Sequence, residues 1–484
     1  MMRSHDPRHP TPKPLTRREM LRQANIGFGS LALSALLADS ARAAAQPDPL
    51  DPRPPHYRAR AKRVIFLFMK GGPSQMDTFD PKPRLQHDHG KPLPFKKPRL
   101  QFHHTGNLFA SPWRFQRHGK SGTQVSELFP HIAECVDDLC LIHSVHGTNA
   151  AHGGATLKLH TGSDTFIRPS LGSWITYGLG TENQNLPAFV TLSPTLFHGG
   201  AVNFGAAFLP AVYQGTPLGH AGVGVEDVRM KYTTNDRTPT SLQRLQLDWL
   251  QKLQRQQLTK TGPDSTLEAR IQSFELAFRM QTAMPELQDV NNESPETKAL
   301  YGLDNEITRE YGYQCLLARR FAERGVRFIQ VTHQKGEGHW DQHQRLLERH
   351  PENARQVDKP IAGLLKDLKR RGLLKDTLVL WGGEFGRTPV AENYKKDPRK
   401  NGRDHNPDGF TMWLAGGGVK GGFRYGATDE YGYYAVENKV HVHDLHATIL
   451  HALGLDHKDL TYRHAGRDFR LTDEFGEVAH DLFA

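Results

Sequence analysis

Residues 377–422 have the sequence TLVLWGGEFGRTPVAENYKKDPRKNGRDHNPDGFTMWLAGGGVKGG, and the fold prediction rests on them. The two ends, TLVLWG and FTMWLAGGG, are short apolar runs closed by glycines, as buried strands are. In an open α/β sheet, ligands bind in the loops beyond the carboxyl ends of parallel strands. We therefore expect Glu384 and Arg387, directly after the first run, to lie where chemistry takes place. His405 approaches from the other side, just before the second run.

Other segments extend this pattern over the rest of the chain. Further apolar runs predict strands: RVIFLFM (63–69), LCLIHSV (139–145), PAFVTL (187–192) and VRFIQV (326–331). Apolar residues at three- and four-residue steps predict helices between them: 126–139, several within 240–324, 355–372 and 442–455. Residues 84–125 are basic and Pro-rich, and we interpret them as a surface excursion. This order is typical of an α/β protein with a doubly wound, mostly parallel sheet flanked by helices.

The composition limits the domain count and the classes of partner. The chain has 484 residues, but we find no Pro/Ser-rich linker past residue 60 and no internal repeat, so we expect one domain over residues 62–484. The formal charge of +10 comes from scattered residues, so we expect no nucleic-acid binding. A small anionic substrate or an acidic glycan fits this charge. Three cysteines cannot build a disulfide framework, although a Cys135–Cys140 bridge is an alternative to buried thiols.

The N-terminus predicts export. TRREMLR (16–22) places two arginines before the apolar segment IGFGSLALSALLA (26–38), and ARAAA (41–45) follows as a cleavage site. We interpret residues 1–45 as a twin-arginine (Tat) signal read by the Tat machinery, which implies a periplasmic or secreted protein. An amphipathic helix with two chance arginines is the alternative. The apolar segment is too short for a transmembrane span, and Pro- and Arg-rich residues 46–61 are expected to form an extended tether.

Metal-type ligands follow two predicted strands and precede a third. His339, Asp341 and His343 come after the 326–331 strand, Glu384 comes after the next strand, and His405 precedes the third. Asp341 and His343 are one residue apart, so in an extended loop both would point to the same side. Carboxylates with imidazoles suit zinc, manganese or a similar ion. The sequence therefore predicts a divalent metal site where these loops meet.

Two other loops carry candidate residues. Asp77, in KGGPSQMDTFDPKP (70–83), is a further candidate metal ligand after the first strand. The strand at 139–145 ends in a Gly-containing turn that leads into a short helix, where an exposed nucleophile or an anion-binding helix N-terminus would be placed. Thr148 is the candidate nucleophile there. Asn149 and His152 are the candidate substrate-binding side chains.

Several strings carry a resemblance to a known family. These are GGPSQMDTFDPKP, GHWDQH, WGGEFGRTP, GRDHNPDGFTMWLAGGGVKGG and YRHAGRDFRLTDEFGEV. They resemble an exported bacterial sulfatase-like family, domain of unknown function 1501, from about residue 60 to the end. That family is similar in turn to the alkaline phosphatase and sulfatase superfamily. The resemblance implies an alkaline-phosphatase-like fold, a doubly wound α/β sheet that holds one or two metals.

The resemblance also implies roles for individual residues. Asp341 and His343 look like the Asp and His of the first metal site, and His405 looks like its late histidine. Glu384 stands where the superfamily has the Asp of an Asp-His pair. The sequence departs from the pattern at Phe385, in place of the pair's histidine.

Other departures concern the first strand and the nucleophile. Gly71 follows the first strand where the superfamily has an Asp. Sulfatases form formylglycine from a Cys of C-x-P/A-x-R, but CLLAR (315–319) has leucine at the critical place, so no formylglycine is expected. Thr148 stands at a position like the superfamily's nucleophile turn. Arg387 is a candidate donor to an anionic oxygen, with a strand-end salt bridge as the alternative.

Two functions follow as hypotheses. The first is an exported metal-dependent hydrolase of sulfate or phosphate esters, with zinc as the metal (manganese and calcium as alternatives) and a small anionic substrate or a sulfated or phosphorylated glycan. The second is a non-catalytic metal-binding or cell-envelope and glycan-binding protein on the same fold, which Phe385 and Gly71 favour.

Overall fold

The computed structural model describes residues 48–96, 105–224, 228, 238–262, 264–334, 339–392 and 400–484. The chain divides into two compact units, Met1–Pro49 and Leu50–Ala484, and the fold below is that of the second. The signal prediction for residues 1–45 lies outside the described residues. Among the described helices, none combines the length and the apolar character that crossing a membrane requires.

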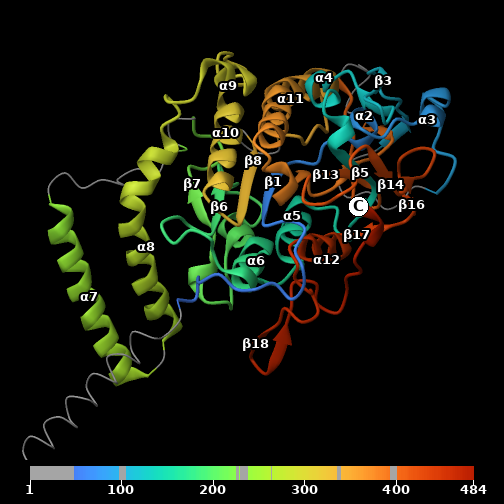
Figure 1. Ribbon diagram of the computed structural model, residues 1–484. Coiled ribbons are helices and arrows are strands. Elements are labelled where there is room, and N and C mark those ends of the chain that lie inside the picture. Colours follow the sequence, from blue (N-terminus) through green and yellow to red (C-terminus); the bar gives the residue numbers. More distant parts are fainter. Residues whose placement is uncertain are drawn as a thin grey trace, which may run out of the picture. The chain divides into compact units, whose positions relative to one another are not determined.

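A central sheet organises the second unit (Figure 1). Its strands run in the order β14 (Phe423–Tyr425), β5 (Leu139–His146), β13 (Phe410–Ala415), β9 (Thr377–Gly382), β1 (Arg63–Met69), β8 (Phe328–His333), β6 (Phe189–Leu192) and β7 (Thr216–Leu218), and β17 (Val440–His441) also pairs with β5. Only β13 is antiparallel to its neighbours in this sheet. The α/β class with a mostly parallel sheet is thus confirmed, as are the strands predicted from apolar runs.

Helices cover both faces of this sheet because the central strands are apolar on both sides. In β1, Ile65, Leu67 and Met69 join the core under α4 (Pro130–Ala133), α10 (Arg309–Glu323) and α11 (Leu346–Arg370). The alternate residues Phe66 and Phe68 join the core under α5 (His152–Thr161), α6 (Leu171–Leu179) and α12 (Val442–Ala452). Figure 1 shows these two sets of helices on opposite faces.

Smaller elements surround the sheet. The remaining helices are α2 (Gln75–Thr78), α3 (Pro83–His87), α7 (Thr240–Thr261), α8 (Ser265–Gln288) and α9 (Pro295–Leu300), with 3-10 turns at η1 (Val136–Asp138), η2 (Gly200–Phe204), η3 (Ala211–Tyr213), η5 (Leu374–Asp376) and η7 (His480–Leu482). Short strand pairs are β2 (Thr105–Leu108) with β11 (Val390–Glu392), β3 (Phe115–His118) with β4 (Thr123–Ser126), β10 (Gly386–Arg387) with β12 (His405–Asn406), β15 (Ala427–Thr428) with β16 (Ala435–Glu437), and β18 (Tyr462–His464) with β19 (Arg467–Phe469).

One predicted helix is wrong in extent. The sequence predicts a helix over residues 126–139, but the structure has only α4 and the 3-10 turn η1 there. Pro130 begins α4, because a proline ring fits the first turn of a helix and breaks an interior turn. The periodicity still marks the buried side chains, since Leu128, Ile132 and Val136 all lie in the core.

The segment before β1 lies along the domain. Its backbone N–H groups donate to carbonyl oxygens of the domain, from Arg53 to Leu179 (3.0 Å) and from Tyr57 to Gly454 (3.2 Å). Hydrogen bonds thus hold this part of the expected tether against the domain. The three cysteines are buried free thiols, so the alternative Cys135–Cys140 bridge is not formed.

Candidate metal centre

Segments next to five strands meet at one edge of the sheet, including the turn after β5 that carries His152. The loops after the parallel strands β1, β8 and β9 all lie there, since these strands end at the same edge. Because β13 runs the other way, its beginning also lies at this edge, and the short ladder of β10 with β12 pairs Arg387 with His405. The loop after β8 is joined to β1 by the backbone N–H of Trp340, which donates to the carbonyl oxygen of Lys70 (3.1 Å).

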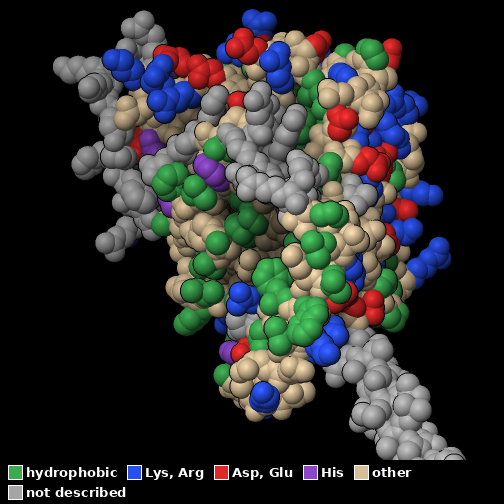
Figure 2. All heavy atoms as spheres, turned by 90° about the vertical axis from the view of Figure 1, so that its left-hand side faces the viewer, with side chains coloured by type: hydrophobic (Ala, Val, Ile, Leu, Met, Phe, Trp, Pro, Cys, Tyr) green, Lys and Arg blue, Asp and Glu red, His purple; other side chains and the backbone are tan. Residues whose placement is uncertain are grey.

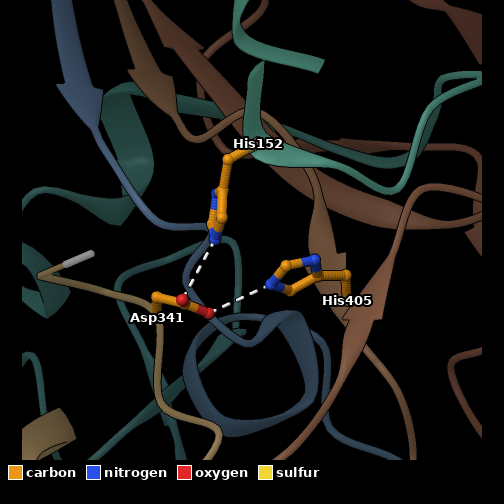
Figure 3. Close-up of side chains that lie close together, drawn as sticks. All are labelled: His152, Asp341 and His405. Carbon is orange, nitrogen blue, oxygen red and sulfur yellow. Dashed lines mark hydrogen bonds and ion pairs between the residues drawn. The ribbon is translucent and has the colours of Figure 1, made fainter. Parts of the chain in front are cut away.

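Asp341 lies at the centre of a cluster of three histidines, two of which are drawn in Figure 3. The Nε2 atom of His152 lies 3.1 Å from Oδ2 of Asp341. The Nε2 atoms of His343 and His405 lie 3.0 and 3.1 Å from Oδ1. Figure 3 shows the rings of His152 and His405 directed at the two carboxylate oxygens from different sides. One carboxylate and three imidazole nitrogens thus converge.

The other ring nitrogen of each histidine is held by an oxygen atom that can only accept. The Nδ1 partners, each at 2.6 Å, are Glu384 Oε1 for His152, Glu392 Oε2 for His343, and the Ala150 carbonyl oxygen for His405. Nδ1 must therefore be the protonated nitrogen in all three rings. In a neutral imidazole this leaves the Nε2 lone pair free to bind a metal, and metal-ligating histidines are held in this way.

The contacts between the rings fit a cation among them. The Nε2 atoms of His343 and His405 are only 2.9 Å apart, a distance at which two lone pairs repel each other. The buried Nε2 of His152 makes no hydrogen bond, although it faces Asp341. Hydrogen bonds to Asp341 and Glu392 outweigh the opposing effect of burial and raise the pKa of His343 to about 9. Burial lowers the pKa of His405 to about 3. A proton on His343 thus lies between the two rings, and a divalent ion would replace it.

Asp404 adds a second carboxylate at the edge of this cluster. Nitrogen and oxygen atoms of His343, Asp404 and His405 lie within 4.8 Å of one another, as do those of His152, Asp341 and His405. Oδ1 of Asp404 accepts from the backbone N–H of His405 (2.7 Å), whereas its buried Oδ2 makes no hydrogen bond. Burial raises the pKa of Asp404. A donor set of imidazoles and carboxylates fits zinc or manganese.

Arg387 holds Asp341 from behind. Its Nη2 donates to Oδ1 of Asp341 (2.7 Å), and other guanidinium hydrogens go to the carbonyl oxygens of Gly72 (2.9 Å) and Arg403 (3.0 Å). Burial works against ionisation of Asp341, but the Arg387 charge and the three histidines hold its pKa well below the usual range. The structure thus gives Arg387 the strand-end salt bridge that the sequence left as the alternative to anion binding.

Glu384 lies outside the cluster, behind the ring of His152. Both of its carboxylate oxygens accept from the backbone N–H of Gly71 (3.0 Å each), and Oε1 also accepts from His152. Burial raises the pKa of Glu384, but the hydrogen bond and charge of His152 outweigh this and lower it to about 2. Glu384 is therefore ionised, and it orients His152 instead of facing Asp341.

The remaining predicted residues lie at different distances from the cluster. Asp77 is buried in an ion pair with Arg403 (2.7 Å), and His339 lies beside Gln356 (3.3 Å). Neither belongs to the two groups of potential ligands found among the described residues. Asn149 accepts from the backbone N–H of Ala151 (2.9 Å) in the turn before α5. Thr148, in the same turn, is exposed.

Sequence reasoning gave His152 a different role and did not single out Glu392 or His198. His152 was expected to bind substrate, yet its ring lies in the cluster. Glu392, which orients His343, is fully buried in the apolar strand β11, and a buried acid among apolar neighbours is the signal that a partner must be near. His198 stacks on His152 with ring centroids 5.1 Å apart, and its sequence context carries no signal that predicts this contact.

Comparisons with known proteins place the chain in a family. Residues 61–483 match the family model described as Protein of unknown function (DUF1501). A comparison with curated proteins finds no match.

Solved structures give only a distant likeness. They include the lipoteichoic acid synthase LtaP from Listeria monocytogenes, 10% identical over 87% of this chain and 78% of that one, with a TM-score of 0.37. The alkaline phosphatase from the Antarctic bacterium TAB5 is 10% identical over 83% of this chain and 100% of that one (TM-score 0.35). The PsFucS1 sulfatase from Pseudoalteromonas sp. is 11% identical over 82% and 68% (TM-score 0.33). At such identities and scores the likeness says nothing about the chemistry of this chain.

Proposed function

The chain belongs to the family described as Protein of unknown function (DUF1501), and we propose that it is an exported metal-dependent hydrolase of phosphate or sulfate esters. One observation carries the proposal. Three imidazoles, each held at Nδ1 by an acceptor, direct their Nε2 atoms at the carboxylate of Asp341. The sequence strings resemble this family, which is similar in turn to the alkaline phosphatase and sulfatase superfamily, and that similarity supports ester hydrolysis as the reaction.

Four side chains would hold the ion: His152, Asp341, His343 and His405. Imidazole-rich sets favour zinc or manganese, whereas calcium prefers oxygen ligands. A bound divalent ion would act as a Lewis acid on an ester oxygen and lower the pKa of a nearby water.

The chain's own residues provide orientation and exclude water. Glu384 and Glu392 fix the rings of His152 and His343, and Arg387 keeps Asp341 ionised. The buried ring of Phe385 packs against His152 (4.8 Å between centroids) and against His405 (4.4 Å), so one side of the cluster is apolar. Phe385, which stands in place of the superfamily's histidine, thus keeps water away from this side of the cluster.

Thr148 is the hydroxyl that we propose as nucleophile, with a water as the alternative. It is exposed in the turn between β5 and α5, four residues before His152. A small anionic ester or a sulfated or phosphorylated glycan is the substrate class that fits a chain with a formal charge of +10.

Export is part of the proposal. The arginine pair and apolar segment within residues 1–45 support a Tat signal and a periplasmic or secreted location. Replacing Arg17 and Arg18 by lysine should leave the protein in the cytoplasmic fraction. A variant that is still exported at the normal rate would contradict this part.

A non-catalytic metal-binding protein is the second candidate. Arg387 favours it, because the positive guanidinium contacts Asp341 and would repel a metal ion there. Thr148 favours it too, because this side chain is exposed and, within the described ranges, makes no hydrogen bond to the cluster. The two candidates share the metal centre and differ in turnover.

Elemental analysis tests the metal centre first. The protein is purified without added metal and without a His tag, beside an Asp341→Ala/His405→Ala double variant. We expect near-stoichiometric metal in the wild type and none in the folded double variant. Folded wild-type protein that holds no metal, even after incubation with zinc or manganese, would contradict both candidate functions.

A screen of aryl phosphates and aryl sulfates then separates the candidates. Turnover that disappears in the double variant supports the hydrolase, and a loaded wild type without turnover on any ester supports the second candidate. Thr148→Val distinguishes the nucleophiles. A loaded Thr148→Val variant that keeps full turnover indicates attack by water.

A further inference from the structure

Helix α7 exposes an apolar stripe. Leu242, Leu245, Trp249 and Leu253 follow one another at steps of three and four residues, so they lie on one face of the helix. Their exposed fractions are 44%, 55%, 60% and 53%. We call these four residues the α7 stripe. A contiguous exposed apolar surface of this kind marks a site of interaction with a protein or a membrane.

The opposite face of α7 is polar and is the one that packs on α8. Gln251 donates to Glu275 of α8 (2.8 Å), and Arg244 donates to both oxygens of the same carboxylate. Gln281 of α8 donates to Gln243 (2.9 Å). An ordinary surface helix buries its apolar face and exposes its polar one. Because α7 does the reverse, its packing on α8 leaves the stripe uncovered.

The charged residues of α7 are mostly positive. Helix α7 has four Lys or Arg residues and a single acid, Asp248, which already pairs with Arg244 (2.8 Å). Lys252 lies over the ring of Trp249, 5.8 Å from its centroid. Within the described part of the chain, Lys252, Arg255 and Lys260 make no ion pair with an acid. This combination suits an anionic partner, whereas a second copy would bring the same positive helix against its own kind.

We propose that α7 is an interfacial helix that docks the protein on a bilayer surface with anionic headgroups. Trp and Leu side chains on one face with Lys and Arg beside them are typical of helices that lie in the plane of a membrane interface. Trp249 would sit at headgroup level, and the cations would contact phosphate groups.

The position of the helix agrees with this proposal. Helix α7 lies at the left-hand side in Figure 1, beside α8 and away from the central sheet. Figure 2, drawn from that side, shows hydrophobic side chains gathered in the middle and lower part of the face and charged side chains mainly around them. Docking there would leave the metal centre, at the edge of the sheet, free to act.

Quenching of Trp249 fluorescence tests the proposal in the full chain. The protein is mixed with phosphatidylcholine vesicles that carry brominated acyl chains, with and without phosphatidylglycerol. The chain has six tryptophans, so the signal is taken as the difference between the wild type and Trp249→Phe. This difference isolates the quenching of Trp249 from that of the other five tryptophans.

We expect quenching of Trp249 that depends on phosphatidylglycerol and weakens when the salt concentration is raised to about 0.5 M. Lys252→Gln/Arg255→Gln/Lys260→Gln should lower the partition coefficient at least about tenfold, since each cation near an anionic surface contributes to binding. Leu245→Gln/Leu253→Gln should abolish quenching of Trp249. Phe166→Gln/Ile167→Gln, which removes two exposed apolar side chains elsewhere (65% and 68%), should leave it unchanged.

Two results would overturn the proposal. The first is an absence of Trp249-dependent quenching on vesicles rich in phosphatidylglycerol. The second is a dimer in sedimentation velocity that Leu245→Gln/Leu253→Gln dissociates, which would assign the stripe to a second copy. Circular dichroism and metal content, expected to match the wild type in every variant, show that the fold is intact.

Discussion

His152 and Glu384 are 232 positions apart in the chain, and the Nδ1 atom of His152 lies 2.6 Å from Oε1 of Glu384. The same carboxylate accepts from the backbone N–H of Gly71, 3.0 Å from each oxygen. Glu384 therefore joins the first turn of α5 to the loops after β1 and β9. It also fixes the orientation of the His152 ring, and so turns Nε2 toward Asp341.

Glu384→Gln should weaken metal binding by about 10- to 100-fold, as is usual for residues that orient metal-ligating histidines. A glutamine side chain is neutral, so the hydrogen bond from His152 loses its charge assistance, and the NH2 group would face the Gly71 N–H that Oε2 now accepts. A competition titration against a chromophoric chelator measures the affinity.

Glu134→Gln is the matched control, because Glu134 lies on the surface in an ion pair with Lys366 and should show wild-type affinity when replaced. Equal affinities for the two variants would contradict the role of Glu384.

Asp77→Asn should destabilise the protein and leave its metal content unchanged. Asp77 and Arg403 are both fully buried, with Nε of Arg403 2.7 Å from Oδ2 of Asp77. Removing one partner leaves the other charge buried and uncompensated, which lowers the free energy of unfolding by about 3–5 kcal/mol. Urea unfolding and elemental analysis measure the two quantities.

The double variant Asp77→Asn/Arg403→Met separates this explanation from a metal-ligand role. If the cost comes from the unpaired cation, the double variant should be more stable than Asp77→Asn alone. Folded Asp77→Asn protein without metal would instead mark Asp77 as a ligand.

The sequence predicted the location of the site because it follows from strand direction. Apolar runs marked the strands, and the carboxyl ends of parallel strands lie at one edge, so Asp341, His343 and Glu384 had to lie close together. His405 precedes its strand, and it reaches the same edge only because β13 is antiparallel to β9. No local pattern shows that reversal, which depends on how the chain crosses the sheet.

The sequence could not predict which side chains face the centre and which lie behind it. Glu384 and Asp341 are both carboxylates in strand-end loops, yet Asp341 faces the Nε2 atoms of three histidines, whereas Glu384 contacts only Nδ1 of His152. The Gly71 N–H occupies one side of the Glu384 carboxylate, and the Arg387 guanidinium occupies one side of the Asp341 carboxylate. These two contacts decide how each acid is oriented. His152 was placed in the right turn and given a different role, because the direction of its ring is decided by Glu384.

Gly71→Ala should disturb both the fold and the metal centre. Gly71 has φ +109°, a backbone angle that residues with a side chain rarely adopt. A Cβ atom there would lie 2.7 Å from the backbone nitrogens of Trp340 and Asp341. Such a contact must displace the loop that carries Asp341. We expect a loss of at least about 2 kcal/mol in the free energy of unfolding, together with weaker metal binding.

Gly90→Ala is the control for backbone strain, because Gly90 has φ +80° and a Cβ atom there meets nothing within 4 Å. It should show the cost of the backbone conformation, about 1–2 kcal/mol, with normal metal affinity. If the two variants were alike in stability and in metal affinity, the contact with the Asp341 loop would have no effect.

Acid should destabilise the protein through buried neutral histidines away from the metal centre. His446 of α12 is buried and lies 2.8 Å from the carbonyl oxygen of Leu159, and burial lowers its pKa to about 3. Its pKa in the unfolded chain is about 6.5. A histidine whose pKa is lower in the folded state contributes its full stabilisation of the fold at pH values above its pKa in the unfolded chain. This contribution is lost as the pH falls through 6.5 toward the pKa in the folded state.

His446→Gln tests this by removing one such group while keeping a donor for Leu159. Between about pH 6 and pH 4, the free energy of unfolding of the wild type should fall more steeply than that of the variant by up to about 1.4 kcal/mol per pH unit. His160, whose pKa burial lowers to about 4, remains in both proteins and cancels in the difference. Urea unfolding at several pH values measures the two slopes. Parallel curves would mean that His446 takes up no proton on unfolding, and hence that it is already protonated in the folded protein.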